Sequence, residues 1–436
     1  MRDLMMLGAM FFLIPMALRN AFAAYLIWGW TAFIAIDEYL YGFMTSMRMN
    51  MLFALITLGL LFINSRKLEG QWTRNRTNTL LIIWFVHGTL SAIFAYTGVA
   101  SNWVLYEKLA KVLIFVLIMP LIVYGRFRIH SFVIALCLGI GFHALIEGLK
   151  YINSGGAHHV QGLAKFGDNN LFAVMILMGM PLLLYIYRQS ANRLTKIAAL
   201  SGAGLTIAAV MGTHSRGGML AMVAAGMWLI LTGRRKLLTL TVAGAMVAVV
   251  ITFAPSSWLE RMDTIQTADQ DASFLGRIEA WQISSAMALS NPVLGGGFHA
   301  IENANVWGQF RGSTGLLGFL PNYQFSPVNF RAAHSAYFEV MGDRGLLGFL
   351  IFIAILANTI FTTFETRRLA RAAGPGMAWA SDLATALSAV MIAYAAGGAG
   401  VSVAYAEMLY VVAILSEILK HHVLTEGPKA PARIKY

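Results

Sequence analysis

The residues best suited to chemistry are arginines and a histidine in separate polar stretches between long apolar runs. Arg216 lies in Thr213-His-Ser-Arg-Gly-Gly218, and Arg277 lies in a long polar segment further along. His334 lies in Arg331-Ala-Ala-His-Ser-Ala-Tyr-Phe-Glu339, just before another apolar run. A guanidinium presents a planar fork of donors that suits phosphate oxygens. A neutral imidazole can take a proton from a hydroxyl near neutral pH. These residue types therefore suit gripping a diphosphate and activating a hydroxyl.

Each of these residues also has a plainer interpretation, which the residues alone leave open. Arg216 is equally well explained as a headgroup-level arginine that binds lipid phosphate or extends its charge to the interface. Arg277 is better explained on its own by an ion pair with Glu279 or a nearby aspartate. A lone histidine such as His334 at a membrane interface is more often a hydrogen-bonded structural residue.

Other polar residues in the same stretches are further candidates. Asp168 precedes an apolar run and is predicted to cap its helix, with a role toward a polar substrate second. His299 follows Gly295-Gly-Gly297, which is a turn signal and only a weak phosphate-loop pattern. Glu339 lies five residues after His334, off its helical face, and is expected to orient the region. The candidates for substrate binding are Arg331, Ser215, Glu339, Lys165 and His299.

Cysteine and metal chemistry have little support in the sequence. Cys137 is the single cysteine and lies inside an apolar run, which excludes a disulfide framework and a cysteine metal site. No histidine or carboxylate spacing typical of a metal motif stands out. We therefore expect neither a tightly bound metal nor another cofactor.

Composition predicts the class of protein that must position these residues. Charged residues make up only 12% of the 436-residue chain and hydrophobic residues 58%, whereas a soluble domain carries roughly 25% charged residues. The charges lie between long apolar runs, and a bilayer core needs roughly 20 apolar residues per helix. We expect one all-α polytopic membrane domain over residues 1–436, with about 12 transmembrane helices.

The two apolar segments nearest the N-terminus, Leu4–Leu18 and Ala21–Ile36, are short for full spans. Counting every segment as a full span back from a cytoplasmic tail would place Met1 outside, beside Arg2. Basic residues favour the cytoplasmic side. We therefore expect one of these two segments to be a partial or tilted insertion.

The distribution of charge predicts the orientation and the partners. The net charge is +12, but most basic residues lie in alternate short loops, as the positive-inside rule requires of cytoplasmic loops. This pattern favours charge that sets the topology of a protein among membrane lipids over nucleic-acid binding, and binding of anionic lipid or phosphate is the main alternative. The first apolar run lacks a small-residue cleavage site, so no removable signal peptide is expected.

The polar segment 255–345 is predicted to be one large loop on the non-cytoplasmic side, with short helices within it. It contains Trp258, Trp281 and Trp307, and the stretch that begins at Arg277 has the pattern of an amphipathic helix. Loops of this length are usually functional. A solvent-facing linker is the alternative, but the aromatic content argues against disorder.

The order of these motifs resembles the O-antigen ligase and polymerase superfamily of bacterial envelopes. The motifs are Ser215-Arg-Gly-Gly218, Gly276-Arg-x-x-x-Trp281, Asn291-Pro-x-x-Gly-x-Gly297, Ala333-His-Ser-x-x-x-Glu339 and Gly342-x-x-Gly-x-x-Gly348. The N-terminal Met1-Arg-Asp-Leu with its paired short segments is similar to the ligase branch, which includes protein O-glycosylation ligases.

The resemblance implies a metal-independent, inverting glycosyltransferase of the membrane-embedded GT-C type. It implies a multi-pass protein of the bacterial inner membrane, with the active site and the 255–345 loop facing the periplasm. The donor would be an O-antigen glycan on undecaprenyl diphosphate, and the acceptor a sugar hydroxyl of lipid A–core, completing lipopolysaccharide. Arg216, Arg277 and His334 would be the catalytic residues. Apolar grooves between spans would hold the prenyl chain.

Three rival functions remain open. A polymerase of the same superfamily and a ligase with a protein acceptor would share the donor chemistry and differ in the acceptor groove. A transporter or flippase for the lipid-linked glycan would need polar residues near the midplane and often has internal repeats. The polar residues here cluster instead at the outer ends of the apolar runs.

Overall fold

A computed structural model describes residues 2–65, 70–96, 100–162, 167–233, 272–322, 324 and 330–427 of the chain. Within these residues the structure consists of α-helices, short 3-10 helices and connecting turns, with no strand. The predicted all-α fold is therefore confirmed for this part of the chain.

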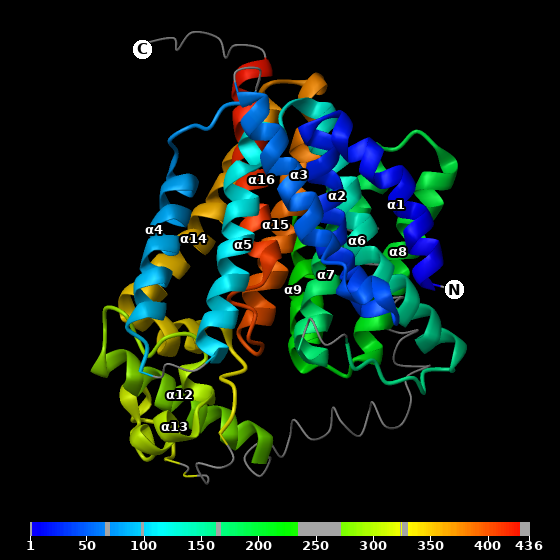
Figure 1. The fold of residues 1–436 in the computed structure, drawn as a ribbon. Coiled ribbons are helices and arrows are strands. Elements are labelled where there is room, and N and C mark those ends of the chain that lie inside the picture. The colour runs from blue at the N-terminus through cyan, green and yellow to red at the C-terminus, as the bar shows by residue number, and fades with distance from the viewer. Residues whose placement is uncertain are drawn as a thin grey trace.

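Long helices stand side by side and form the body of the molecule (Figure 1). They are α1 (Arg2–Arg19), α2 (Ala21–Ile34), α3 (Met49–Ile63), α4 (Arg76–Ile93), α5 (Ala100–Ile122), α6 (Gly125–Asn153), α7 (Asn169–Gln189), α8 (Arg193–Gly212), α9 (Arg216–Thr232), α14 (Ala336–Ala372), α15 (Ala378–Gly398) and α16 (Glu407–Glu426). Short 3-10 helices connect some of them: η1 (Ile36–Tyr39), η2 (Phe43–Ser46) and η8 (Pro375–Met377).

Six helical segments are long and apolar enough to cross a membrane by length and composition, so the chain is a multi-pass membrane protein. They are α6, α7, α8, α14, the segment Pro375–Gly397 that contains most of α15, and α16. The apolar helices α2, α3 and α9 are shorter. At 14 residues, α2 extends only about 21 Å, short of the roughly 30 Å hydrocarbon core. The sequence has a further apolar run at Leu237–Ala254, and this run and the first part of the predicted loop, residues 255–271, lie outside the described residues.

Basic residues hold together one end of the bundle, where α9, α14 and α16 finish and α6 and α15 begin. The Arg367 guanidinium of α14 donates to the Thr232 carbonyl at the end of α9 at 2.8 Å. Arg126, early in α6, lies over the Trp379 ring of α15 at 5.3 Å. The opposite end of the bundle carries α12 and α13 (Figure 1).

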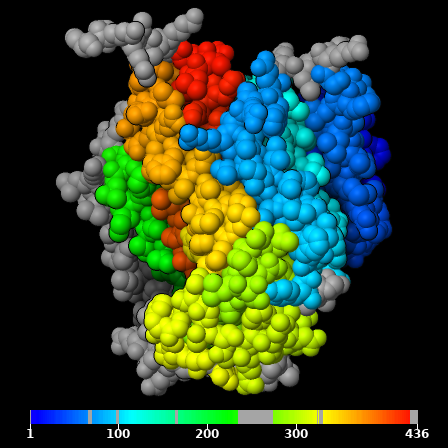
Figure 2. Space-filling view, turned by 90° about the vertical axis from the view of Figure 1, so that its left-hand side faces the viewer, coloured from blue at the N-terminus to red at the C-terminus, as the bar shows by residue number. Residues whose placement is uncertain are grey.

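A small helical cap covers that opposite end (Figure 2). It contains α12 (Ala272–Ser290), η5 (Ala300–Glu302), α13 (Ala304–Phe310) and η6 (Gly315–Leu317). Its helices bury a core of their own, made of Ala280, Ile283, Ala286, Met287, Ala300, Ile301, Val306, Trp307 and Phe310. The stretch predicted to be amphipathic around Arg277 is part of α12.

The cap is joined to the bundle at a break in α14. Gly345 has a φ of +69°, which interrupts the helix and which glycine adopts without a steric cost. The Gly296 amide donates to the Gly342 carbonyl at 2.9 Å, and the Leu347 amide donates to the Pro292 carbonyl at 2.9 Å. The turn at 291–297 thus lies directly against the break, and this contact fixes the cap relative to α14.

Candidate functional site

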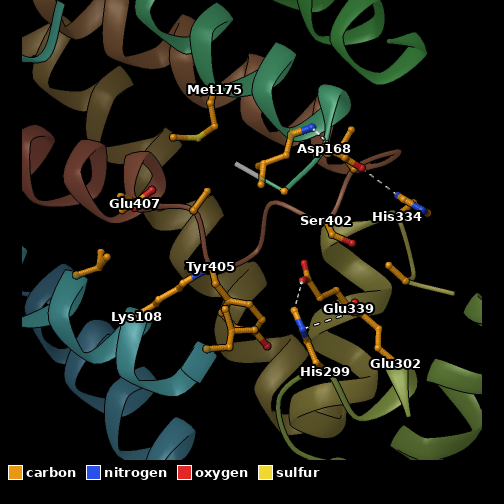
Figure 3. Close-up of a pocket in the computed structure, with 17 residues that line it drawn as sticks. Lys108, Asp168, Met175, His299, Glu302, His334, Glu339, Ser402, Tyr405 and Glu407 are labelled. Carbon is orange, nitrogen blue, oxygen red and sulfur yellow. Dashed lines mark hydrogen bonds and ion pairs between the residues drawn. The ribbon is translucent and has the colours of Figure 1, made fainter. Parts of the chain in front are cut away.

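A cavity of about 450 Å³ opens between the cap and the bundle. Its walls come from α5, the start of α7, the turn that contains His299, the start of α14 and the loop before α16 (Figure 3). Its polar and aromatic lining consists of Lys108, Asp168, His299, Glu302, His334, Glu339, Ser402, Tyr405 and Glu407. Apolar residues of α5 and α7, namely Leu105, Val112, Leu171 and Met175, complete it.

His334 lies at the rim of this cavity, just before α14. Its φ is +45°, an uncommon conformation for a residue other than glycine. Its Nδ1 lies 3.8 Å from Oδ2 of Asp168, an ion-pair distance (Figure 3). The Asp168 side chain caps α7, because its Oδ1 accepts a hydrogen bond from the Leu171 amide at 2.7 Å. The predicted helix cap is confirmed, and the same carboxylate also faces the imidazole.

The surroundings of His334 keep its imidazole neutral near neutral pH. Burial lowers the pKa of His334, the positive charge of Arg277 lowers it further, the Asp168 carboxylate opposes this, and Arg331 again lowers it. A neutral imidazole can accept a proton. The structure thus brings Arg277 and Arg331 into the electrostatic surroundings of His334, although neither lines the cavity.

Helix α12 holds Arg277 near His334 through a neighbouring tryptophan. Trp281 lies four residues after Arg277, so the two side chains share one face of the helix. The Trp281 indole donates to the Ala333 carbonyl at 2.7 Å, and its ring stacks on Phe338 with centroids 5.0 Å apart. These contacts lie on both sides of His334 in the sequence.

Steric crowding by Arg331 explains why a glycine occupies position 276, next to Arg277. A Cβ atom at this position would lie 2.6 Å from the Nη1 atom of Arg331, which is closer than side-chain atoms approach. The absence of a side chain therefore allows the Arg331 guanidinium to pack against α12 at Gly276, and Arg277 and Arg331 both act electrostatically on His334.

Arg216 begins α9 on the bundle side of the site. Ser215 is buried and caps this helix by accepting a hydrogen bond from the Gly218 amide at 3.0 Å. The Asn169 amide group donates to the Thr213 carbonyl at 2.7 Å, which places this turn next to Asp168. A Cβ at Gly217 would lie 2.5 Å from Val401, a cavity residue. The Arg216 backbone therefore adjoins the wall of the cavity, although the residue does not line it.

His299 and Glu339 face each other on the cap side of the cavity. His299 Nδ1 lies 3.6 Å from Glu302, and its Nε2 lies 4.0 Å from Oε1 of Glu339. The other Glu339 oxygen accepts a hydrogen bond from the Ala404 amide at 3.2 Å. Glu339 thus fixes the loop before α16 while facing the cavity.

Sequence reasoning singled out only part of this site. Lys165, which is predicted to bind substrate, lies outside the described residues. Lys108, Glu302, Tyr405 and Glu407 were not singled out, because the only signal for them was a position near the outer ends of apolar runs. Among the residues that the structure describes, no group of three or more histidine, cysteine or acidic side chains is placed to hold a metal ion.

Comparisons with known families cover most of the chain. Residues 201–353 match the family model described as O-antigen ligase, a range that contains Arg216, Arg277 and His334. Residues 1–191 match a second model, described as a family of unknown function. A search of curated proteins found no match to the chain.

Proposed function

Because the chain belongs to the O-antigen ligase and polymerase superfamily, we propose that it is an O-antigen ligase. It transfers an O-antigen glycan from undecaprenyl diphosphate to a sugar hydroxyl of lipid A–core. The observation that carries the proposal is the position of His334, a neutral base at the rim of the cavity that faces the Asp168 carboxylate and lies within the electrostatic influence of Arg277.

The proposed reaction is a single displacement that the residues around His334 can support. His334 takes the proton of the acceptor hydroxyl, and the hydroxyl oxygen attacks the anomeric carbon of the donor. The bond from that carbon to the diphosphate oxygen breaks, undecaprenyl diphosphate leaves, and the anomeric centre inverts. The nearby Asp168 carboxylate stabilises the imidazolium that forms.

The arginines take the role of stabilising the leaving group. Negative charge develops on the diphosphate as the bond breaks, and preorganised cations in a partly buried site stabilise it strongly. Arg277 supplies one guanidinium near His334, and Arg216 supplies another from the start of α9. Arg331 and Lys165 would bind the donor phosphates and sugars, and Ser215 would hold the turn that presents Arg216. In this proposal no metal or other cofactor takes part.

The proposal places the protein in the inner membrane, with the cavity facing the periplasm. Its support is that Arg126 and Arg367 lie at the end remote from the cavity, whereas the arginines near the cavity are assigned to the donor diphosphate. Basic residues favour the cytoplasmic side. The same proposal includes a GT-C architecture with about 12 spans and a periplasmic loop over residues 255–345.

Transfer by purified variants in proteoliposomes tests the proposal. We expect Arg277→Ala and Arg216→Ala each to lower the rate of transfer to lipid A–core by roughly 10²- to 10³-fold, the cost of removing one preorganised electrostatic donor. Arg311→Ala is the matched control, because Arg311 is an exposed arginine of the same cap, and it should transfer normally.

The choice of acceptor separates ligation from its rivals. The same donor is offered with lipid A–core, with no second acceptor, and with a serine- and threonine-containing protein. Product on lipid A–core supports the ligase. Product only as lengthened donor would mean a polymerase, product only on protein would mean a protein ligase, and movement of intact donor across the bilayer without transfer would mean a flippase.

A further inference from the structure

The cavity lining and the guanidinium groups near His334 differ in charge. Arg277 and Arg331 act electrostatically on His334 but do not line the cavity, and the Arg331 guanidinium packs against Gly276 of α12. Among the described residues, the lining contains the carboxyl groups of Asp168, Glu302, Glu339 and Glu407, and one lysine, Lys108. A diphosphate therefore suits the guanidinium groups, and a group that binds carboxylates suits the lining.

Glu339 offers an acceptor that the protein itself does not use. Its side chain is 10% exposed, and its Oε2 is hydrogen-bonded to the Ala404 amide. No hydrogen bond reaches its Oε1 from the described part of the chain, since His299 Nε2, at 4.0 Å, is beyond hydrogen-bond distance. Figure 3 shows this carboxylate directed into the cavity between His299 and Ser402. This oxygen can therefore accept a hydrogen bond from a molecule bound in the cavity.

Tyr405 gives the same part of the cavity an aromatic surface. Its hydroxyl donates to Oδ2 of Asp343 at 3.0 Å, and its ring packs on Phe298 with centroids 5.0 Å apart. Because the hydroxyl has its own acceptor, the ring is held at a fixed position in the wall. Unused carboxylate acceptors beside a fixed ring suit a polyhydroxylated group with apolar C–H faces.

From this geometry we propose that the acceptor sugar binds on the His299–Tyr405 side of the cavity. There Glu302 and Glu339 accept hydrogen bonds from its hydroxyl groups. The carboxylates select uncharged or amine-bearing acceptor sugars and reject phosphorylated or carboxylated ones. This inference rests on the proposed function, since it assigns the guanidinium groups and the cavity lining to the two substrates of that reaction.

Like-charge repulsion is the physical basis of the selection. A phosphate on the acceptor sugar would lie next to the Glu302 carboxylate, and juxtaposed like charges are strongly disfavoured at a binding site. An amine would instead gain charge-assisted hydrogen bonds. The donor diphosphate avoids the same carboxylate and is directed to the guanidinium groups.

Three core oligosaccharides that differ only in their terminal sugar test the inference: one ends in glucose, one in glucose phosphate and one in glucosamine. In the reconstituted full-length protein we expect kcat/KM for the phosphorylated acceptor to be about tenfold or more below that for the other two. Glu302→Gln should reduce this ratio at least roughly threefold, since it removes one charge from the wall and leaves its shape.

Glu107→Gln is the matched control, because Glu107 lies on α5 next to Lys108 but its side chain is 63% exposed, in an ion pair with Lys111. It should leave the ratio unchanged. A ratio near one in the wild type, or an equal ratio in wild type and Glu302→Gln, would overturn the inference. Because the comparison is made within each variant, a partial loss of folded protein does not alter it.

Equilibrium dialysis of the same oligosaccharides separates this inference from the proposed reaction. The subsite would be supported if the phosphorylated acceptor bound more weakly than the other two and Glu302→Gln reduced this difference. This holds even if no acceptor were glycosylated, a result that would make the ligase proposal fail. Transfer to all three acceptors at equal rates, with equal binding, would refute the subsite and leave the ligase proposal standing.

Discussion

At the scale of the residue, the proposed reaction depends on the charged groups that surround the imidazole of His334. The residue types of Arg216, Arg277 and His334 suggested a chemistry, and the family resemblance favoured it over the plainer alternatives, so their catalytic roles stay a prediction. The partner of His334 was not predictable as such. The sequence around Asp168 predicted that its side chain caps a helix, and the structure confirms this cap. Nothing in that local sequence indicates that the second carboxylate oxygen of Asp168 faces His334.

The pH dependence of transfer follows from the lowered pKa of His334. Because the neutral imidazole is the base, transfer should fall as pH drops through that pKa, and the acid limb of kcat/KM should lie below the ordinary histidine value of about 6.5. Arg331→Gln removes a charge that lowers the pKa and should move the limb upward. Asp168→Asn removes a charge that raises the pKa and should move the limb downward. An acid limb above 6.5 in the wild type, or shifts of the opposite sign, would contradict this assignment.

Metal dependence is a second test at this scale. If guanidinium groups alone neutralise the leaving diphosphate, excess EDTA should leave the transfer rate unchanged. The measurement is initial transfer rate in proteoliposomes with and without chelator. A strong loss that Mg²⁺ restores would show that the arginines do not suffice.

At the scale of the element, the break in α14 is the feature that assembles the site. The sequence analysis indicates an apolar run after His334, and this run, Leu346–Phe364, lies within α14, but α14 begins ten residues earlier, at Ala336. That first part is polar, so hydropathy gave no signal for it. It contains the fully buried Arg344, whose guanidinium donates to the Trp84 carbonyl at 2.7 Å and contacts His87. Such burial of an arginine depends on packing between α4 and α14 that a single sequence does not reveal.

Gly345→Ala tests the role of the break. A Cβ there would lie 2.7 Å from the carbonyl oxygens of Asn291 and Pro292. The backbone angles, φ +69° and ψ −174°, are open essentially to glycine alone and cost about 1–3 kcal/mol for another residue. We expect a lower thermal unfolding midpoint in detergent and weaker transfer. Gly226→Ala in α9 is the control, because nothing lies within 4 Å of a Cβ there, and helix propensity favours alanine by about 1 kcal/mol. Equal midpoints for both variants would show that the break tolerates a side chain.

At the scale of the whole molecule, the protein separates its functions along the bundle. Basic side chains hold one end, and the cavity lies beneath the cap at the other (Figures 1 and 2). The orientation of the bundle in a membrane stays a prediction from the charge pattern, which depends on where basic residues lie in the sequence rather than on detailed contacts. The number of spans was harder to predict, since helices such as α2 fall short of a full crossing and length alone does not say how deeply they insert.

The most direct test of the central claim is single-turnover transfer by His334→Ala in proteoliposomes with undecaprenyl-diphosphate-linked glycan and lipid A–core. The account predicts a rate roughly 10²- to 10⁴-fold below wild type, the usual contribution of a general base, with donor binding retained. Transfer at the wild-type rate would contradict it, because no imidazole at this position would then be needed to take the acceptor proton.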